Sequence, residues 1–194
     1  MRFFTVVIFA ATFLAGCLPM VARHYFPSSE AGELIYSNCL GQTHIPRDIR
    51  FVRNRTRVDA ALVRHRDNLY LRVLITPAES SSVQLHEHAA RVYVGESTQA
   101  HAAAFDSISL VDPIYLEVPN TQTMEIDRPM IGERRRVGNF DYDRNYWLTT
   151  KLEVFEAKLI RVVLPELAID GESVIFPAIR FKNELMTGLQ FFNC

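Results

Sequence analysis

Two histidines separated by one residue, His86 and His88, have a spacing that could hold a transition metal. Side chains two positions apart on a strand point to the same face, so a strand here would place both imidazoles together. A metal site also needs a third ligand from a neighbouring strand, for which His101 or a carboxylate is a candidate. Solvent-facing histidines and a pH-sensitive contact are the alternatives. Since the sequence fixes no third ligand, we assign no metal and keep the pair as a candidate.

A second group, Asp141, Asp143 and Asn145, has the spacing of the oxygen ligands that open an EF-hand calcium loop. The resemblance to that loop ends there, because Tyr146 stands where glycine is needed and Leu152 where the bidentate glutamate belongs. Distant ligands would have to complete a calcium site, and a polar turn with a solvated acidic face is the other interpretation. We therefore predict no cofactor.

The sequence lacks the usual signs of a catalytic nucleophile. It contains no Gly-x-Ser-x-Gly motif, and no glycine-rich phosphate loop follows a predicted strand. We therefore predict a non-enzymatic protein. The competing class is a metal-binding or hydrolytic enzyme that would use His86 and His88, or Asp141 and Asp143.

Residues 125–146 are the best candidate for a contact surface, because they mix proline and glycine with charged and aromatic residues. Structureless segments this long are uncommon inside compact domains and tend to be functional or disordered. We predict an ordered, exposed loop that contacts an acidic protein or anionic lipid headgroups. The candidate partner-binding residues are Arg134, Arg135, Arg136, Asp141, Tyr142, Asp143 and Tyr146.

Formal net charge is −1 at pH 7, which argues against nucleic acid as a partner. The charge is nevertheless uneven, with arginines concentrated in residues 47–72 and acidic residues in residues 79–127. Neighbouring strands of opposite charge would pair across a sheet, or the two regions would form a dipolar surface that steers a charged partner.

Period-two alternation of apolar residues recurs along most of the chain and predicts short strands. Residues 69–75 and 148–154 are the clearest examples, and Asp170-Gly171 predicts a type I′ hairpin that joins residues 167–169 to 174–176. The alanine-rich residues 98–105 are the main helical candidate. The pattern favours an all-β, antiparallel β-sandwich of immunoglobulin-like layout with one long loop around 125–146, and a closed barrel is the second choice.

The N-terminal segment carries the motif with the most specific resemblance. Arg2 precedes an apolar run of about twelve residues, shorter than the roughly 20 that span a membrane. This order of charge, apolar run and small residues is that of a secretory signal. Its end, Leu14-Ala15-Gly16-Cys17, resembles the lipobox of bacterial lipoprotein precursors. The alternative is an ordinary signal peptide with an incidental cysteine.

The resemblance implies that Cys17 is diacylated, that residues 1–16 are removed, and that the new amine is acylated too. Leu18 resembles the outer-membrane sorting signal of enteric lipoproteins. With Cys17 assigned to lipid, Cys39 and Cys194 remain as a pair in an oxidising compartment. A disulfide between them would close a loop of about 155 residues, worth about 3–5 kcal/mol. Free thiols and intermolecular bridges are the alternatives.

We therefore expect a signal peptide at 1–16, a lipid-anchored tether at 17–32 and a β-sandwich domain at 33–194. The predicted function is that of a binding protein held by acyl chains in a bacterial envelope membrane, expected to be the outer membrane, and facing the periplasm. Its expected partner is a protein, in either toxin immunity or envelope and secretion assembly.

Overall fold

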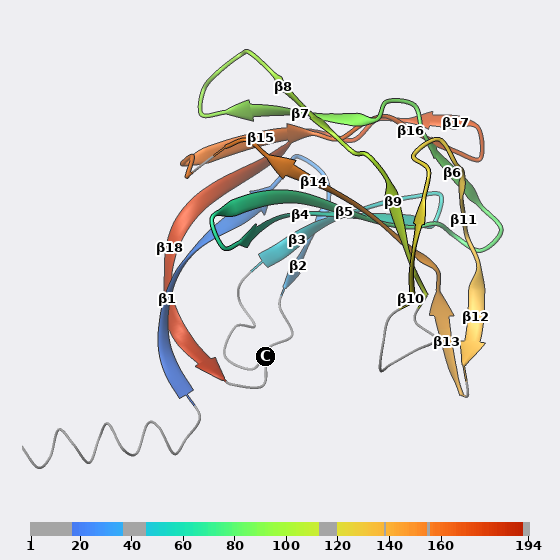
Figure 1. The fold of residues 1–194 in the computed structure, drawn as a ribbon, viewed down its shortest axis with the longest axis horizontal. Helices are drawn as coiled ribbons and strands as arrows, with labels where there is room; N and C mark the ends of the chain where they lie inside the picture. The colour runs from blue at the N-terminus through green and yellow to red at the C-terminus, as the bar shows by residue number, and fades with distance from the viewer. Residues whose placement is uncertain (1–16, 37–45, 113–119, 138, 155, 192–194) are drawn as a thin grey trace, which may run out of the picture.

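The chain is an all-β protein of antiparallel sheets, as predicted from the alternating pattern (Figure 1). The computed structural model describes residues 17–36, 46–112, 120–137, 139–154 and 156–191. Two large sheets form a β-sandwich, while the immunoglobulin-like layout stays a prediction. Within these described residues, no helix is long and apolar enough to cross a membrane.

The strands form three sheets and one separate ribbon. Sheet A has the order β1 (Cys17–Ser28), β18 (Ile179–Phe191), β15 (Leu159–Val163), β7 (Ala89–Val94) and β8 (His101–Ala104). Sheet B has the order β10 (Asn120–Met124), β9 (Ile108–Asp112), β14 (Asn145–Leu152), β5 (Asn68–Thr76), β4 (Thr56–His65), β3 (Pro46–Arg53) and β2 (Glu33–Tyr36). Sheet C has the order β11 (Met130–Ile131), β6 (Ser82–Leu85), β16 (Leu167–Ile169) and β17 (Glu172–Val174). Strands β12 (Arg134–Val137) and β13 (Phe140–Asp143) pair only with each other and are called the β12–β13 ribbon.

The core lies between the inner faces of sheets A and B and continues under sheet C. In β5, alternate residues are buried and the residues between them are half-buried, as expected for a strand with one face against the core. The same alternation appears in β14. The buried residues of these two strands are Leu69, Leu71, Val73, Ile75, Thr76, Tyr146, Leu148, Thr150 and Leu152.

The hairpin turn predicted at Asp170-Gly171 is confirmed, but its second strand covers residues 172–174 rather than the expected 174–176. Asp170 and Gly171 have φ values of 53° and 83°, the left-handed conformation that a type I′ turn requires at both central residues. They join β16 to β17, with Ile169 opposite Glu172 in the register.

Three segments differ from the sequence-based expectation. Residues 17–28, expected within a tether, form β1, whose prolines are tolerated because β1 is an edge strand. Residues 98–105, a helical candidate, contain β8, because pairing with β7 outweighs the helix propensity of alanine. Residues 125–146, expected to be one long loop, contain β11 and the β12–β13 ribbon.

Two antiparallel arms project from the same side of the sandwich (Figure 1). Strand β18 pairs with β15 over residues 179–182, and the Asn183 N–H still donates to the Lys158 oxygen at 2.9 Å. Among the described strands, residues 184–191 pair with β1 alone and form the first arm. The β12–β13 ribbon is the second arm. Sheet B lies between the arms, and β7 and β8 lie on the opposite side of the molecule (Figure 1).

Candidate functional site

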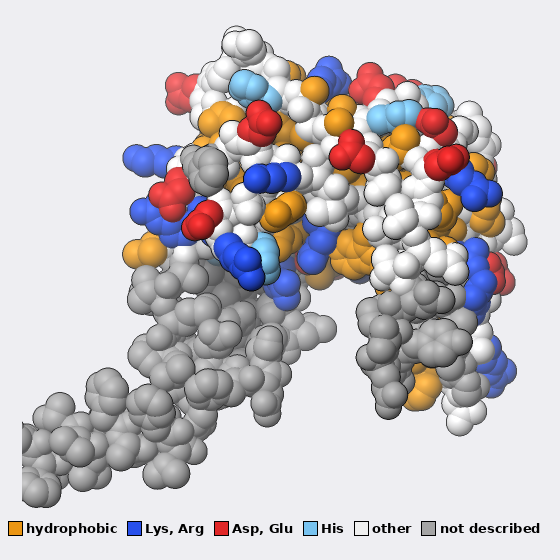
Figure 2. All heavy atoms as spheres, in the orientation of Figure 1, with side chains coloured by type: hydrophobic (Ala, Val, Ile, Leu, Met, Phe, Trp, Pro, Cys, Tyr) orange, Lys and Arg blue, Asp and Glu red, His pale blue; other side chains and the backbone are white. Residues whose placement is uncertain are grey.

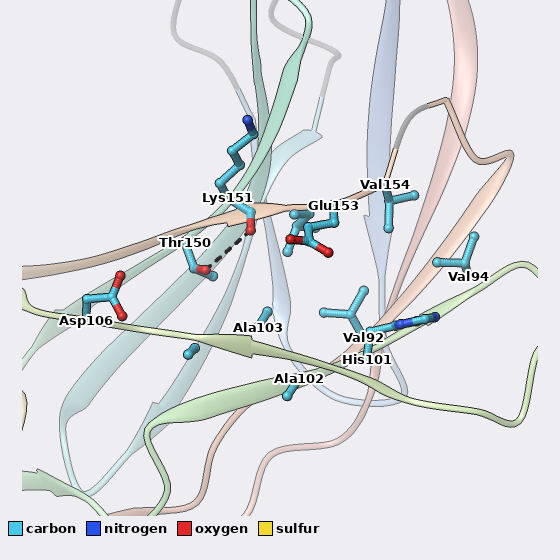
Figure 3. Close-up of a pocket in the computed structure, with 12 residues that line it drawn as sticks. Val92, Val94, His101, Ala102, Ala103, Asp106, Thr150, Lys151, Glu153 and Val154 are labelled. Carbon is cyan, nitrogen blue, oxygen red and sulfur yellow. Dashed lines mark hydrogen bonds between the residues drawn. The ribbon is translucent and has the colours of Figure 1, made fainter.

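A cleft of about 610 Å³ opens between the edge of sheet A and the end of β14 (Figure 3). Its wall comes from three segments that are far apart in the sequence: β7, β8 with the residues after it, and β14 with the residues after it. The lining residues are Val92, Val94, His101, Ala102, Ala103, Ala104, Asp106, Thr150, Lys151, Leu152, Glu153 and Val154.

The floor of the cleft is apolar. Val92, Ala103 and Leu152 are buried in the core and present their side chains at its base. Strand β8 consists largely of alanine, so its side chains occupy little of the space between the two sheets. Small residues at this edge therefore leave room for another chain or an apolar group.

The rim of the cleft is polar. Asp106 and Glu153 place exposed carboxylates there, whereas the side chain of Lys151 is exposed on the other side of β14 and points away from the cleft (Figure 3). The Thr150 hydroxyl lines the cleft and lies 3.5 Å from the backbone oxygen of Lys151. The two carboxylates give the rim a negative charge, which favours an occupant that carries a cationic group.

One edge of β8 has no strand beside it in the described part of sheet A. The Phe105 N–H donates to the His88 oxygen at 2.8 Å, and Ala103 pairs with Ala90 in the same register. Hydrogen-bonded pairs alternate along an antiparallel ladder, so Ala103 is bonded to β7. The backbone groups of Ala102 and Ala104 therefore point to the open edge. An extended peptide can add to such an edge through main-chain hydrogen bonds.

The predicted histidine pair does not form a shared site. His86 and His88 lie in the bend between β6 and β7 rather than on a strand, so the expectation of one common strand face is wrong. The His86 Nδ1 atom is 2.9 Å from the Glu166 carboxylate, and His88 Nε2 is 2.9 Å from the Asp127 carboxylate. In the described ranges, no group of three or more His, Cys, Asp or Glu residues could hold a metal ion.

Glu166 is held mainly in its ionised form. The Ser173 hydroxyl donates a hydrogen bond to its carboxylate, and His86 contributes a second one, so the pKa of Glu166 lies below its usual value. This contact connects the bend that holds the histidines to sheet C.

Two members of the calcium-like triplet, Asp143 and Asn145, are engaged with other side chains. The two oxygens of Asp143 face Arg57 at 3.0 Å and Arg134 at 3.3 Å. The Asn145 amide oxygen accepts a hydrogen bond of 2.7 Å from the Thr76 hydroxyl. The triplet also spans the end of β13 and the start of β14 rather than one loop. The oxygens of Asp143 and Asn145 therefore stabilise the base of the β12–β13 ribbon.

Six of the seven candidate partner-binding residues lie on the β12–β13 ribbon. In its register, Arg134 is opposite Asp143, Arg135 is opposite Tyr142, and Arg136 is opposite Asp141. Glu133 at the base of the ribbon pairs with both Arg135 and Arg144. The hydrogen bond from Arg135 holds the pKa of Glu133 below its usual value, and the charge of Arg144 adds to this effect.

The seventh candidate, Tyr146, is a core residue, so its assignment to a contact surface is wrong. It is 2% exposed, and its hydroxyl donates to the Ile131 oxygen at 2.8 Å. The same hydroxyl accepts a hydrogen bond of 3.0 Å from the Ile131 N–H. Tyr146 therefore connects β14 to β11.

The cysteine predictions fall largely outside the described residues. Cys39, Cys194 and the signal segment 1–16 all lie there, so the disulfide stays a prediction. Cys17 is the first residue of β1, and its backbone pairs with that of Phe191 at the end of the first arm.

Sequence reasoning missed the cleft altogether. The sequence signal for the cleft was the run of small alanine residues that follows the alternating Val92 and Val94. Alanine favours helices, so this run was interpreted as a helix instead. No protein-family model, curated protein or solved structure matches this chain.

Proposed function

We propose that this chain is a non-catalytic, lipid-anchored protein of a bacterial envelope whose cleft receives an extended segment of a protein partner. The observation that carries the proposal is the cleft, with its apolar floor and polar rim, beside the open edge of β8. The partner's backbone pairs with Ala102 and Ala104, and alternate partner side chains enter the cleft. Main-chain bonds supply affinity, and the pocket with its negatively charged rim supplies specificity.

The proposed anchor is Cys17, on the strength of the Leu14-Ala15-Gly16-Cys17 motif. In this proposal the acyl chains hold the protein at the outer membrane with the cleft in the periplasm. Cys17 begins β1 at the end of an arm, away from the cleft (Figure 1). Anchor and partner site then lie at opposite sides of one rigid sandwich.

The test of the cleft replaces one backbone donor at the open edge. Ala104→Pro removes an N–H that points away from β7, so it should leave the ladder with β7 intact. Ala104→Ser is the matched control, because it keeps the N–H and adds little volume. Peptides selected from a random display library on the full chain in detergent are measured by fluorescence polarisation against both variants.

We expect selected peptides with alternating apolar residues to bind wild type and Ala104→Ser alike, and Ala104→Pro about tenfold more weakly. Circular dichroism and the urea midpoint check that the proline variant is folded. Equal binding to both variants would place the peptide site elsewhere. The anchor is tested separately by metabolic labelling with an alkynyl fatty acid, which should mark the wild type and not Cys17→Ser.

A further inference from the structure

The β12–β13 ribbon has two unlike faces. Residues opposite each other in an antiparallel pair project to the same side. Arg134 and Asp143 therefore share one face with Arg136 and Asp141. Phe140, Tyr142 and Arg135 share the other face, where the Phe140 and Tyr142 ring centroids are 6.4 Å apart. The ribbon thus has a charged face and an aromatic face that includes one arginine.

The outer end of the ribbon carries an apolar side chain with little protein around it. Phe140 is 67% exposed and is the first residue of β13 after the turn. The opposite end of the ribbon is well held, because Arg144 N–H donates to the Glu133 oxygen at 2.9 Å and Arg57 pairs with Asp143. An isolated two-stranded ribbon is marginally stable in water. We therefore expect its exposed aromatic face to be covered by another surface that shields it from water.

The direction of the ribbon indicates what that surface is. The outer end of the ribbon, where Val137 pairs with Phe140, and the start of β1 at Cys17 are directed to the same side of the molecule (Figure 1). Basic side chains line the ribbon in the same view (Figure 2). A bilayer that holds acyl chains on Cys17 would therefore lie against the outer end of the ribbon. This step depends on the proposed lipid anchor.

We propose that the β12–β13 ribbon is a second membrane contact, which inserts Phe140 into the surface of the anionic bilayer that holds Cys17. Phe140 enters the boundary between headgroups and acyl chains, and Tyr142 lies at headgroup level. Arg136 faces lipid phosphates, while Arg134 remains paired with Asp143 and Arg135 with Glu133. Residues 133–144 contain four arginines and three carboxylates, so the electrostatic attraction is small and the apolar end supplies most of the binding.

A lipid surface suits this ribbon better than a protein does. Stable protein interfaces bury about 800 Å² on each partner. Two strands of four residues with two aromatic side chains provide little of that area, whereas interfacial insertion needs few residues. Contacts at two arms also fix the orientation of the sandwich, and they leave β8 and its cleft on the side away from the bilayer (Figure 1).

The test uses single-tryptophan variants of the full chain. Trp147 is the one native tryptophan, so Trp147→Phe provides the background. Phe140→Trp reports on the ribbon, and Ile175→Trp is the matched control, because Ile175 is 69% exposed and follows β17. Each protein is reconstituted in vesicles of phosphatidylcholine and phosphatidylglycerol, with or without brominated acyl chains. Fatty-acid labelling is measured on the same samples.

We expect the indole at position 140 to lose about half or more of its emission to brominated lipid, since insertion reaches about 5–10 Å into the bilayer boundary. The indole at position 175 should be unaffected. Labelled protein without quenching at position 140 would overturn the ribbon proposal and leave the anchor standing. Quenching without labelling would support the ribbon and overturn the anchor.

Two further outcomes would also overturn the ribbon proposal. Equal quenching at positions 140 and 175 would indicate non-specific adsorption to the vesicles. Shielding of position 140 from aqueous iodide by an added protein, without lipid quenching, would make the ribbon a protein-docking element.

Discussion

The burial of Tyr146 can be tested by removing its hydroxyl. This hydroxyl makes two hydrogen bonds to the backbone of Ile131, at 2.8 and 3.0 Å, inside a site that is 2% exposed. Tyr146→Phe removes both bonds and leaves the ring in place. At a net 0.5–1.5 kcal/mol for each bond, the free energy of unfolding should fall by about 1–3 kcal/mol. The melting temperature should fall by about 2–4 °C for each kcal/mol in a chain of this size.

The assay is urea unfolding followed by circular dichroism and by the fluorescence of Trp147. Tyr70→Phe is the matched control, because Tyr70 is half-buried on the outer face of sheet B and its hydroxyl has no bond in the described part of the chain. The slope with urea should be unchanged in both variants. If Tyr146→Phe were as stable as Tyr70→Phe, the bridge between β14 and β11 would carry no stability. If it weakened partner binding without lowering stability, Tyr146 would belong to a contact surface after all.

Two further experiments test local packing and the pH dependence of stability. Gly132→Ala should lower the free energy of unfolding by about 3 kcal/mol or more, because its Cβ would lie 1.6 Å from the Ala78 oxygen. Gly171→Ala is the control, because a Cβ at Gly171 would have no atom within 4 Å; its positive φ alone should lower the free energy of unfolding by about 1–2 kcal/mol. If urea unfolding gave similar losses for Gly132→Ala and Gly171→Ala, the steric argument would be contradicted. Burial lowers the pKa of His24 below 6.5, against the opposing effect of its bond to the Pro46 oxygen. As the pH falls, His24 is therefore protonated in the unfolded chain at a higher pH than in the folded chain. The free energy of unfolding should consequently decline as the pH falls below about 6.5. Unfolding at pH 8 and pH 5.5 should show a larger decline for wild type than for His24→Gln, and equal declines would assign the effect to other groups.

The strands that were predictable from the sequence are those that cover the core with one face. In β5 and β14 the alternation of apolar and polar residues follows directly from burial of one side. The β16–β17 turn was predictable because Asp170 and Gly171 tolerate positive φ. In each case a local pattern of a few residues determines the structure.

The elements that sequence reasoning missed have no one-sided apolar pattern. The three consecutive arginines of β12 place charge on both faces of the ribbon, so the strand lacks an alternating signal. Strand β1 is paired along its length with β18, about 160 residues away in the chain, and main-chain bonds need no particular side-chain pattern. The cleft depends on β7, β8 and β14 meeting in space, which no local pattern encodes.

The charge pattern of the sequence was also resolved by tertiary structure. Residues 47–72 were expected to pair with the acidic residues 79–127 or to form a dipolar surface. In the structure, Arg50 instead forms two hydrogen bonds to Asp59, at 2.7 and 2.8 Å, and Arg72 pairs with Asp48 at 3.4 Å. The hydrogen bonds to Asp59 raise the pKa of Arg50 above its usual value.

These pairs lie on the outer face of sheet B, which is the face between the two arms (Figure 1). Arg72 also lies over the ring of Trp147, 4.8 Å from its centroid. Arg50 and Arg72, which would otherwise attract an anionic ligand to this face, are thus engaged with neighbours of their own sheet. A ligand bound there would have to break these contacts, whereas the open edge of β8 offers backbone groups that point to solvent. The electrostatics of sheet B therefore favour the cleft, on the opposite side of the molecule, as the site of partner binding.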